Sequence, residues 1–175
     1  MAKQKQIDIW IDKLTNSIVN TISGESFPTS ITLVKLAELK SVTKANGWNF
    51  NWKTEVKKND QQVYKLTTRD NPTIIHGLVS LKLEEDHVFV SIIENAPFNI
   101  GKTKLYKGVP ANLFAYACKV SWDLGNQGAV AFVSKTRLLE HYEQSLGAVH
   151  LGNSRMVILP MDALNLIRRY FLNQK

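Results

Sequence analysis

The 175-residue chain has a single cysteine, Cys118, so a disulfide within the chain is excluded. Its apolar neighbours Ala117 and Val120 predict a buried, inert thiol, because free cysteines are among the most buried residue types. One cysteine and four scattered histidines lack the ligand spacing of a zinc site. The sequence therefore predicts no metal, and a fold that depends on its hydrophobic core.

Long apolar runs are also missing. The first residues, MAKQKQIDIWIDK, have no apolar stretch followed by a small-residue cleavage site, as a secretory signal would. No run is long enough to span a bilayer. We expect a cytoplasmic protein with no membrane partner.

Charge is the one compositional excess, with a formal net charge of +7. The lysines are dispersed, and dispersed charge usually belongs to a solvated surface. An anionic partner stays open as an alternative, either a nucleic acid or a phosphate-bearing cofactor.

The N-terminal region carries apolar residues at near-helical spacing: Ile7, Trp10, Leu14, Ile18 and Ile22. This spacing predicts an amphipathic helix over residues 5–22, ended by Ser23-Gly24. We interpret residues 1–27 as a helical extension and residues 28–175 as the main domain. The helix would pack on that domain or on a second copy of the chain, in a homodimer.

The first half of the domain is rich in β patterns. A strand is expected over 31–36 and a short helix over 37–47. Residues 48–53, WNFNWK, predict a strand or connector with one aromatic face in the core, the alternative being the wall of a substrate pocket. Strands follow over 63–68, 74–83 and 88–94, and the last two predict an antiparallel hairpin in the middle of a sheet.

The second half alternates helices and strands. Helices are expected over 109–124, 136–146 and 162–171, and strands over 128–134 and 155–160. A β meander followed by this alternation predicts an α/β (α+β) fold, in which helices cover a mixed sheet.

The segment LLEHYEQSLGA, residues 138–148, resembles a helix of the GNAT acyltransferase superfamily that carries a tyrosine and ends in a Leu-Gly-Ala step. A second similarity is the strand VFVSIIE, followed by a basic, glycine-bearing loop and a helix. The resemblance covers roughly residues 30–160. It implies a central, mixed, mostly antiparallel sheet flanked by helices, and acetyl-CoA as the acyl donor.

The loop before the helix at Val109 has a physical reason to bind phosphate. A helix N-terminus offers N–H donors and partial positive charge, and glycine lets an anion approach. The resemblance implies that the diphosphate of coenzyme A binds here, and the expected cofactor-binding residues are Asn95, Ala96, Lys102, Lys104, Lys107, Gly108, Val109, Ala111 and Asn112. The chain departs from the family pattern at Leu105, where a Gln or Arg is usual, and at Pro110, where a small residue is usual. Lys104 or Lys107 would supply the missing charge.

Two residues are expected to be catalytic. Tyr142 matches the family's tyrosine, whose hydroxyl acts as general acid toward the departing thiolate. Glu94 ends the strand on the parity of Val88, Val90 and Ile92, where desolvation would favour proton uptake by a general base. An exposed strand-end glutamate is the alternative.

These observations predict an acetyl-CoA-dependent N-acetyltransferase with an unidentified amine acceptor. The acceptor pocket would come from residues 37–62 and 148–156. One alternative is a GNAT-shaped interaction or scaffold protein that has lost cofactor binding. Another is a basic nucleic-acid-associated protein that stacks bases on Trp48 and Trp52. The enzymatic interpretation requires an open groove between Tyr142 and the 102–108 loop.

Overall fold

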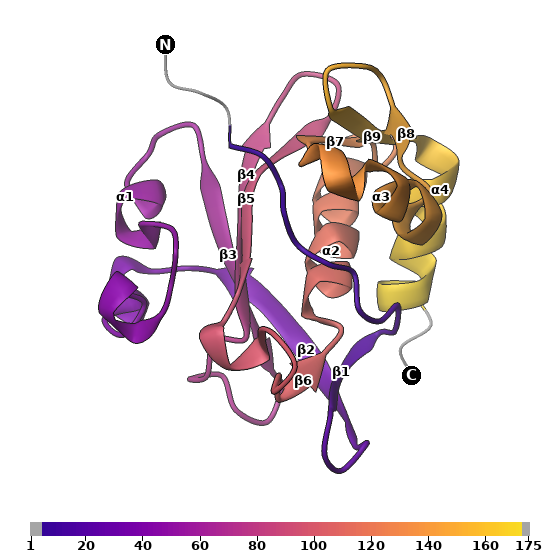
Figure 1. The fold of residues 1–175 in the computed structure, drawn as a ribbon. Coiled ribbons are helices and arrows are strands. Elements are labelled where there is room, and N and C mark those ends of the chain that lie inside the picture. The colour runs from indigo at the N-terminus through magenta and orange to yellow at the C-terminus, as the bar shows by residue number, and fades with distance from the viewer. Residues whose placement is uncertain (1–4, 173–175) are drawn as a thin grey trace.

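The computed structural model describes residues 5–172 (Figure 1). Its sheet has nine strands in the order β6-β1-β2-β3-β4-β5-β7-β9-β8, and β5–β7 is its parallel pair. The strands are β1 (Ser17–Asn20), β2 (Ser26–Leu33), β3 (Gln62–Thr68), β4 (Gly77–Leu83), β5 (Val88–Asn95), β6 (Tyr106–Lys107), β7 (Val130–Val133), β8 (Val149–His150) and β9 (Arg155–Ile158). The predicted β4–β5 hairpin in the middle of a mostly antiparallel sheet is confirmed.

Four α-helices accompany the sheet in the described residues: α1 (Trp52–Val56), α2 (Val109–Asp123), α3 (Leu139–Leu146) and α4 (Pro160–Ile167). Short 3₁₀ turns lie at Leu36–Leu39, Lys44–Asn46, Pro97–Asn99 and Thr136–Leu138, and a π-helical stretch, Arg168–Leu172, follows α4. The α2, α3 and α4 helices lie on one side of the sheet and α1 on the other (Figure 1). None of these helices is long and apolar enough to cross a membrane.

Each face of the sheet has its own core. The larger core packs α2, α3 and α4 against the sheet, with Phe114, Phe132 and Tyr142 fully buried at its centre. The smaller core lies under α1 and contains Trp48 and Trp52. Both tryptophans are buried, so the core interpretation of the 48–53 segment is confirmed, and base stacking on these two rings is excluded.

A β-bulge divides β5 into two halves. Val90 and Ile92 oppose the adjacent residues Leu81 and Ser80, so Ser91 is the extra residue on β5. Beyond the bulge the side-chain parity reverses, because Val90 belongs to the larger core and Ile92 to the smaller one. The predicted shared face of Glu94 with Val88 and Val90 is therefore wrong.

The bulge also marks the point where β5 and β7 part. The two strands share only the pairs Val88↔Val130 and Phe89↔Ala131. The second half of β5 turns away from β7 and leaves a groove between β5 and α3.

The helix predicted over 5–22 is wrong. Residues 5–14 have no helical turn, and Ser17–Asn20 form β1, which pairs with β2 and β6. This region is no separate extension, because Ile7, Ile9, Ile11 and Ile18 all belong to the larger core. The strand expected at 31–36 starts earlier, at Ser26, and the helix expected at 37–47 is two 3₁₀ turns.

Candidate functional site

The groove between β5 and α3 is occupied by the protein's own chain, so the open groove between Tyr142 and the 102–108 loop that the enzymatic interpretation requires is not found. Residues 7–12, the docked segment, run through it in extended conformation (Figure 1). Ile7 pairs in parallel with Ser134, its amide donates to the Val133 carbonyl at 2.6 Å, and its carbonyl accepts from the Lys135 amide at 2.9 Å. The docked segment thus takes the pairing positions on β7 that β5 abandons.

The middle of the docked segment is held by α3. The Tyr142 hydroxyl accepts from the Ile9 amide at 3.0 Å and donates to the Ile9 carbonyl at 2.5 Å. The Ile11 amide donates to His141 Nε2 at 2.9 Å, so that nitrogen is the unprotonated one. The Trp10 ring stacks on His141 at 3.6 Å between centroids. Burial raises the pKa of Tyr142 and lowers the pKa of His141.

The far end of the docked segment reaches the N-terminus of α2. The Asp12 carboxylate accepts from the Gly108 amide at 3.0 Å and from Lys104 Nζ at 2.9 Å. Gly108 is the N-cap of α2 with φ of 103°, and a Cβ there would lie 2.8 Å from the Ser17 carbonyl oxygen. A carboxylate therefore sits where the sequence predicts a phosphate.

The loop that carries Lys104 is ordered from within. Asn99 is buried; its amide nitrogen donates to the His76 carbonyl at 3.2 Å, and its side-chain oxygen accepts from the Tyr106 amide at 3.1 Å. The His76 ring lies edge-on to Phe98 and Tyr106, and burial lowers its pKa to about 4. Lys104 is thus presented by a loop that is built around a neutral histidine.

The other predicted phosphate-loop residues lie either on the surface or in the larger core. Lys102 and Lys107 are exposed, and Lys107 belongs to β6. Val109 and Ala111 are buried in the larger core. The side chains of Val109 and Ala111 therefore face away from any ligand, which leaves their backbone at the start of α2 as the part that could take part.

Asn112 has a structural role that the sequence did not reveal. Its amide nitrogen donates to the carbonyls of Thr15, Ser17 and Gly108, and its oxygen accepts from the Thr29 hydroxyl. The side chain is buried and fully engaged within the protein. It fixes the chain just after the docked segment to the first turn of α2.

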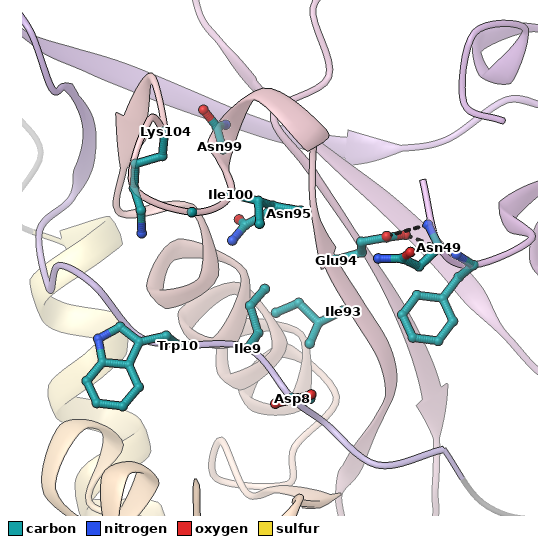
Figure 2. Close-up of a pocket in the computed structure, with 12 residues that line it drawn as sticks. Asp8, Ile9, Trp10, Asn49, Ile93, Glu94, Asn95, Asn99, Ile100 and Lys104 are labelled. Carbon is teal, nitrogen blue, oxygen red and sulfur yellow. Dashed lines mark hydrogen bonds between the residues drawn. The ribbon is translucent and has the colours of Figure 1, made fainter. Parts of the chain in front are cut away.

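Glu94 faces the smaller core, across β5 from Tyr142. Its carboxylate accepts from the amides of Asn49 and Phe50, at 2.7 and 3.3 Å (Figure 2). It also accepts from Trp52 Nε1 at 2.8 Å. Three donors around one buried carboxylate hold the turn that leads into α1 against the sheet. Glu94 is neither exposed nor beside Tyr142, and this geometry makes it a positioning residue.

A cavity of about 330 Å³ remains between the docked segment, the second half of β5 and the 99–104 loop. Figure 2 shows Ile9 and Ile93 side by side across it, with Asn95 and Lys104 at the loop end. The side-chain oxygen of Asn95 is buried without a hydrogen-bond partner in the described residues. Ala96 is buried in the smaller core and does not line this cavity. An unsatisfied acceptor in a cavity is a place for an N–H donor from a ligand.

A second cavity, of about 620 Å³, opens near the bulge of β5. Its lining includes Glu55, Lys58 and Gln61 from one predicted acceptor segment and Arg155 from the other. Lys5 also lines it, so the chain passes from this cavity into the groove and out toward Gly108. The chain thus meets the second cavity at Lys5, before the docked segment, and the first cavity at Asp8, Ile9 and Trp10 within it.

His87 lines the second cavity as well. Its Nδ1 lies 2.6 Å from an Asp86 carboxylate oxygen, and its Nε2 is buried without a partner in the described chain. Lys5 and Arg155 lie over the rings of Phe50 and Phe89. Neither cation forms an ion pair within the described residues, whereas Lys58 pairs with Glu55.

No group of three or more potential metal ligands occurs among residues 5–172, and Cys118 is buried as expected. Burial raises the pKa of the Cys118 thiol, which makes it a poor nucleophile.

Comparisons with known proteins agree with this architecture. No protein-family model and no curated protein sequence matches the chain. Among solved structures, a spermidine N-acetyltransferase from Vibrio cholerae in complex with CoA and spermine matches with a TM-score of 0.58 and 16% identity, over 78% of this chain and 98% of that one. A dodecameric form of spermidine N-acetyltransferase from Vibrio cholerae gives 0.57 and 17%, over 78% and 96%.

A KacTA–DNA complex also matches, with a TM-score of 0.54 and 13% identity, over 79% of this chain and 97% of that one. At such identities the likeness concerns the fold. The chain has a GNAT-like fold: a large, mostly antiparallel sheet with helices on both faces, in which β5 and β7 part at a bulge.

Proposed function

We propose that this protein is an acyl-CoA-dependent N-acyltransferase whose donor lies in the groove between β5 and α3. The observation that carries the proposal is the Asp12 carboxylate on the Gly108 amide and Lys104, because it marks an anion site at one end of that groove. The diphosphate of coenzyme A is an anion that fits a helix N-terminus beside a lysine. Lys102 and Lys107 would add to the local positive potential.

The residues along the groove fit the rest of the donor. The unsatisfied oxygen of Asn95 suits an amide N–H of the pantetheine arm. The Tyr142 hydroxyl, which now bonds a peptide unit on both sides, would face the thioester and protonate the departing thiolate. Glu94 would keep the wall formed by Asn49 and Phe50 in place.

The second cavity is the proposed acceptor site, because both predicted acceptor segments contribute to its lining. Lys5 and Arg155, which form no ion pair within the described residues, favour an amine that also carries an acidic group. The same cations oppose a polyamine, which is the acceptor bound by the Vibrio cholerae structure.

A second candidate, a GNAT-shaped protein without catalysis, is favoured by one observation: the groove contains the docked segment. Leu105 and Pro110 agree with it, because Leu105 supplies no side-chain charge to a phosphate and Pro110 supplies no N–H. In this case the segment would be a permanent part of the core.

Thermal unfolding with and without acetyl-CoA separates the two candidates. Ligand at about a hundredfold excess over its dissociation constant adds about 2.7 kcal/mol, which shifts the midpoint by roughly 5–10 °C at this size. We expect this shift in the wild type and a smaller one in Lys104→Ala. Lys40→Ala, an exposed lysine outside the site, is the matched control. An unchanged midpoint at millimolar acetyl-CoA would select the non-catalytic candidate.

A further inference from the structure

We infer that residues 7–12 act as an internal competitor of acyl-CoA: the docked segment imitates the donor and must leave the groove before the donor binds. This inference rests on the proposed function and adds regulation to the same site. It follows from what each part of the segment contacts.

The end of the docked segment near α2 presents an anion, the Asp12 carboxylate. Asp12 is the only residue of the segment whose side chain contacts the N-terminus of α2, and it does so with a carboxylate. Its second partner, Lys104, is the lysine of the 102–108 loop that points into the groove. Donor diphosphate and Asp12 therefore compete for one amide and one ammonium group.

The middle of the docked segment occupies the Tyr142 hydroxyl. Ile9 offers an N–H and a carbonyl to the same Tyr142 hydroxyl. The peptide groups on both sides of the Ile9 Cα are thus bound as amides of a linear ligand would be, and the buried side chain of Ile9 lies beside Ile93 (Figure 2). While Ile9 is in place, the Tyr142 hydroxyl has no bond to give to a thioester.

The chain that follows the docked segment is fixed in place from Thr15 onward. Asn112 holds the carbonyls of Thr15 and Ser17, and Ser17 begins β1. The strand pairs of β1 with β2 and β6 all lie after this point. Residues 7–12 can therefore leave the groove by a rotation near Lys13 and Leu14, which breaks the pairing of Ile7 with the end of β7 and leaves the nine strands paired.

Release also frees charge at both ends of the segment. Asp8 forms ion pairs with Arg137 and Lys135, and Asp12 pairs with Lys104. Undocking removes two carboxylates from three basic side chains along the groove. The groove becomes more attractive to a polyanion at the same step that opens it.

The test combines hydrogen–deuterium exchange with equilibrium binding of coenzyme A to the full chain. Adding coenzyme A to the wild type should raise the exchange rate of the Ile7, Ile9 and Ile11 amides, whose acceptors all lie in the groove. Asp12→Ala should bind coenzyme A about tenfold more tightly than the wild type, since a charged hydrogen-bonded anchor is lost.

Asp123→Ala is the matched control, because it removes the same charge from an exposed pair with Lys119 on α2. It should leave both the affinity and the exchange rates unchanged. Binding by Asp12→Ala alone, with none by the wild type, would support the inference most strongly.

Two results would overturn the inference, and they have different consequences for the proposed function. Coenzyme A that binds the wild type while the three amides stay protected would refute competition and leave the proposed function standing. No binding by either the wild type or Asp12→Ala would refute the proposed function, and the inference with it. The exchange measurement needs no variant, so it decides even if Asp12→Ala fails to fold.

Discussion

The Tyr142 hydroxyl makes two hydrogen bonds to one residue, Ile9, accepting from its amide at 3.0 Å and donating to its carbonyl at 2.5 Å. The two residues are 133 positions apart in the sequence. A hydroxyl so engaged cannot protonate a thiolate, so activity at this site requires that Ile9 move.

Tyr142→Phe tests both roles of the hydroxyl. It leaves a buried N–H and carbonyl of Ile9 without partners, so the free energy of unfolding should fall by about 1–3 kcal/mol. Turnover should fall at least about tenfold, because a general acid is lost, with KM for acetyl-CoA unchanged or lower. Urea unfolding and steady-state kinetics measure these effects.

Tyr64→Phe is the control for that variant, since the Tyr64 hydroxyl donates to Gln62 on a half-buried strand far from α3. It should cost less stability and no turnover. Full turnover in Tyr142→Phe would remove the tyrosine from the chemistry.

Asn112→Ala should destabilise the fold without acting on the donor directly. Three carbonyls and the Thr29 hydroxyl each lose a hydrogen bond, and the Gly108 and Ser17 carbonyls keep one other donor each, so we expect a loss of about 2–3 kcal/mol in the free energy of unfolding. Asn59→Ala, at an exposed position, should change stability by less than about 0.5 kcal/mol. Equal stability of the two variants would show that Asn112 does not anchor the N-terminal chain.

The free energy of unfolding should decrease as the pH is lowered, because His141 becomes protonated. Burial lowers the pKa of His141, so the folded state prefers the neutral ring that accepts from Ile11. Its stabilisation is complete above the unfolded value of about 6.5 and is lost as the pH drops below it. The loss in unfolding free energy between about pH 7.5 and about pH 5.5 should be smaller in His141→Ala than in the wild type.

His76 titrates in the same direction, with a pKa lowered to about 4, and it is present in both proteins, so its contribution cancels in the comparison. An equal pH dependence in the two proteins would mean that the Ile11 contact does not depend on the neutral imidazole.

Arg155→Ala tests the acceptor site. If Arg155 binds an acidic group on the amine, its removal should raise KM for acidic amines about tenfold to hundredfold and leave KM for acetyl-CoA unchanged. Arg168→Ala, exposed after α4, is the control. Faster turnover of spermidine than of acidic amines by the wild type would contradict this assignment.

Two helices of the second half, α2 and α3, could be predicted because apolar residues recur along them at helical spacing and a glycine, Gly125 or Gly147, follows each. The helix expected at 109–124 is α2, Val109–Asp123, and the helix expected at 136–146 contains α3, which ends at Gly147 with φ of 70°. Local periodicity and local caps decide such elements, so the sequence is sufficient.

The N-terminal segment was mispredicted because two periods fit it. Ile7, Trp10 and Leu14 have helical spacing, whereas Ile7, Ile9 and Ile11 alternate with polar or exposed residues. The structure follows the alternation: these three isoleucines are buried and Trp10 is 58% exposed. The IDIWID alternation was the available signal for an extended segment.

The site could be predicted only in part. Tyr142, Lys104 and Gly108 all hydrogen-bond to residues of the docked segment, whereas their roles toward a cofactor stay predictions. The place of Glu94 depends on the Ser91 bulge, and the role of Asp12 depends on a contact across 96 positions. Neither is encoded in a local pattern, so only the tertiary structure reveals them.

The most direct test of the account is an NMR titration of the ¹⁵N-labelled protein with coenzyme A. If coenzyme A replaces Asp12 at the start of α2, the largest changes in amide chemical shift should occur at Gly108 and through residues 7–12. Amide signals that stay unchanged at those positions, at millimolar coenzyme A, would contradict it.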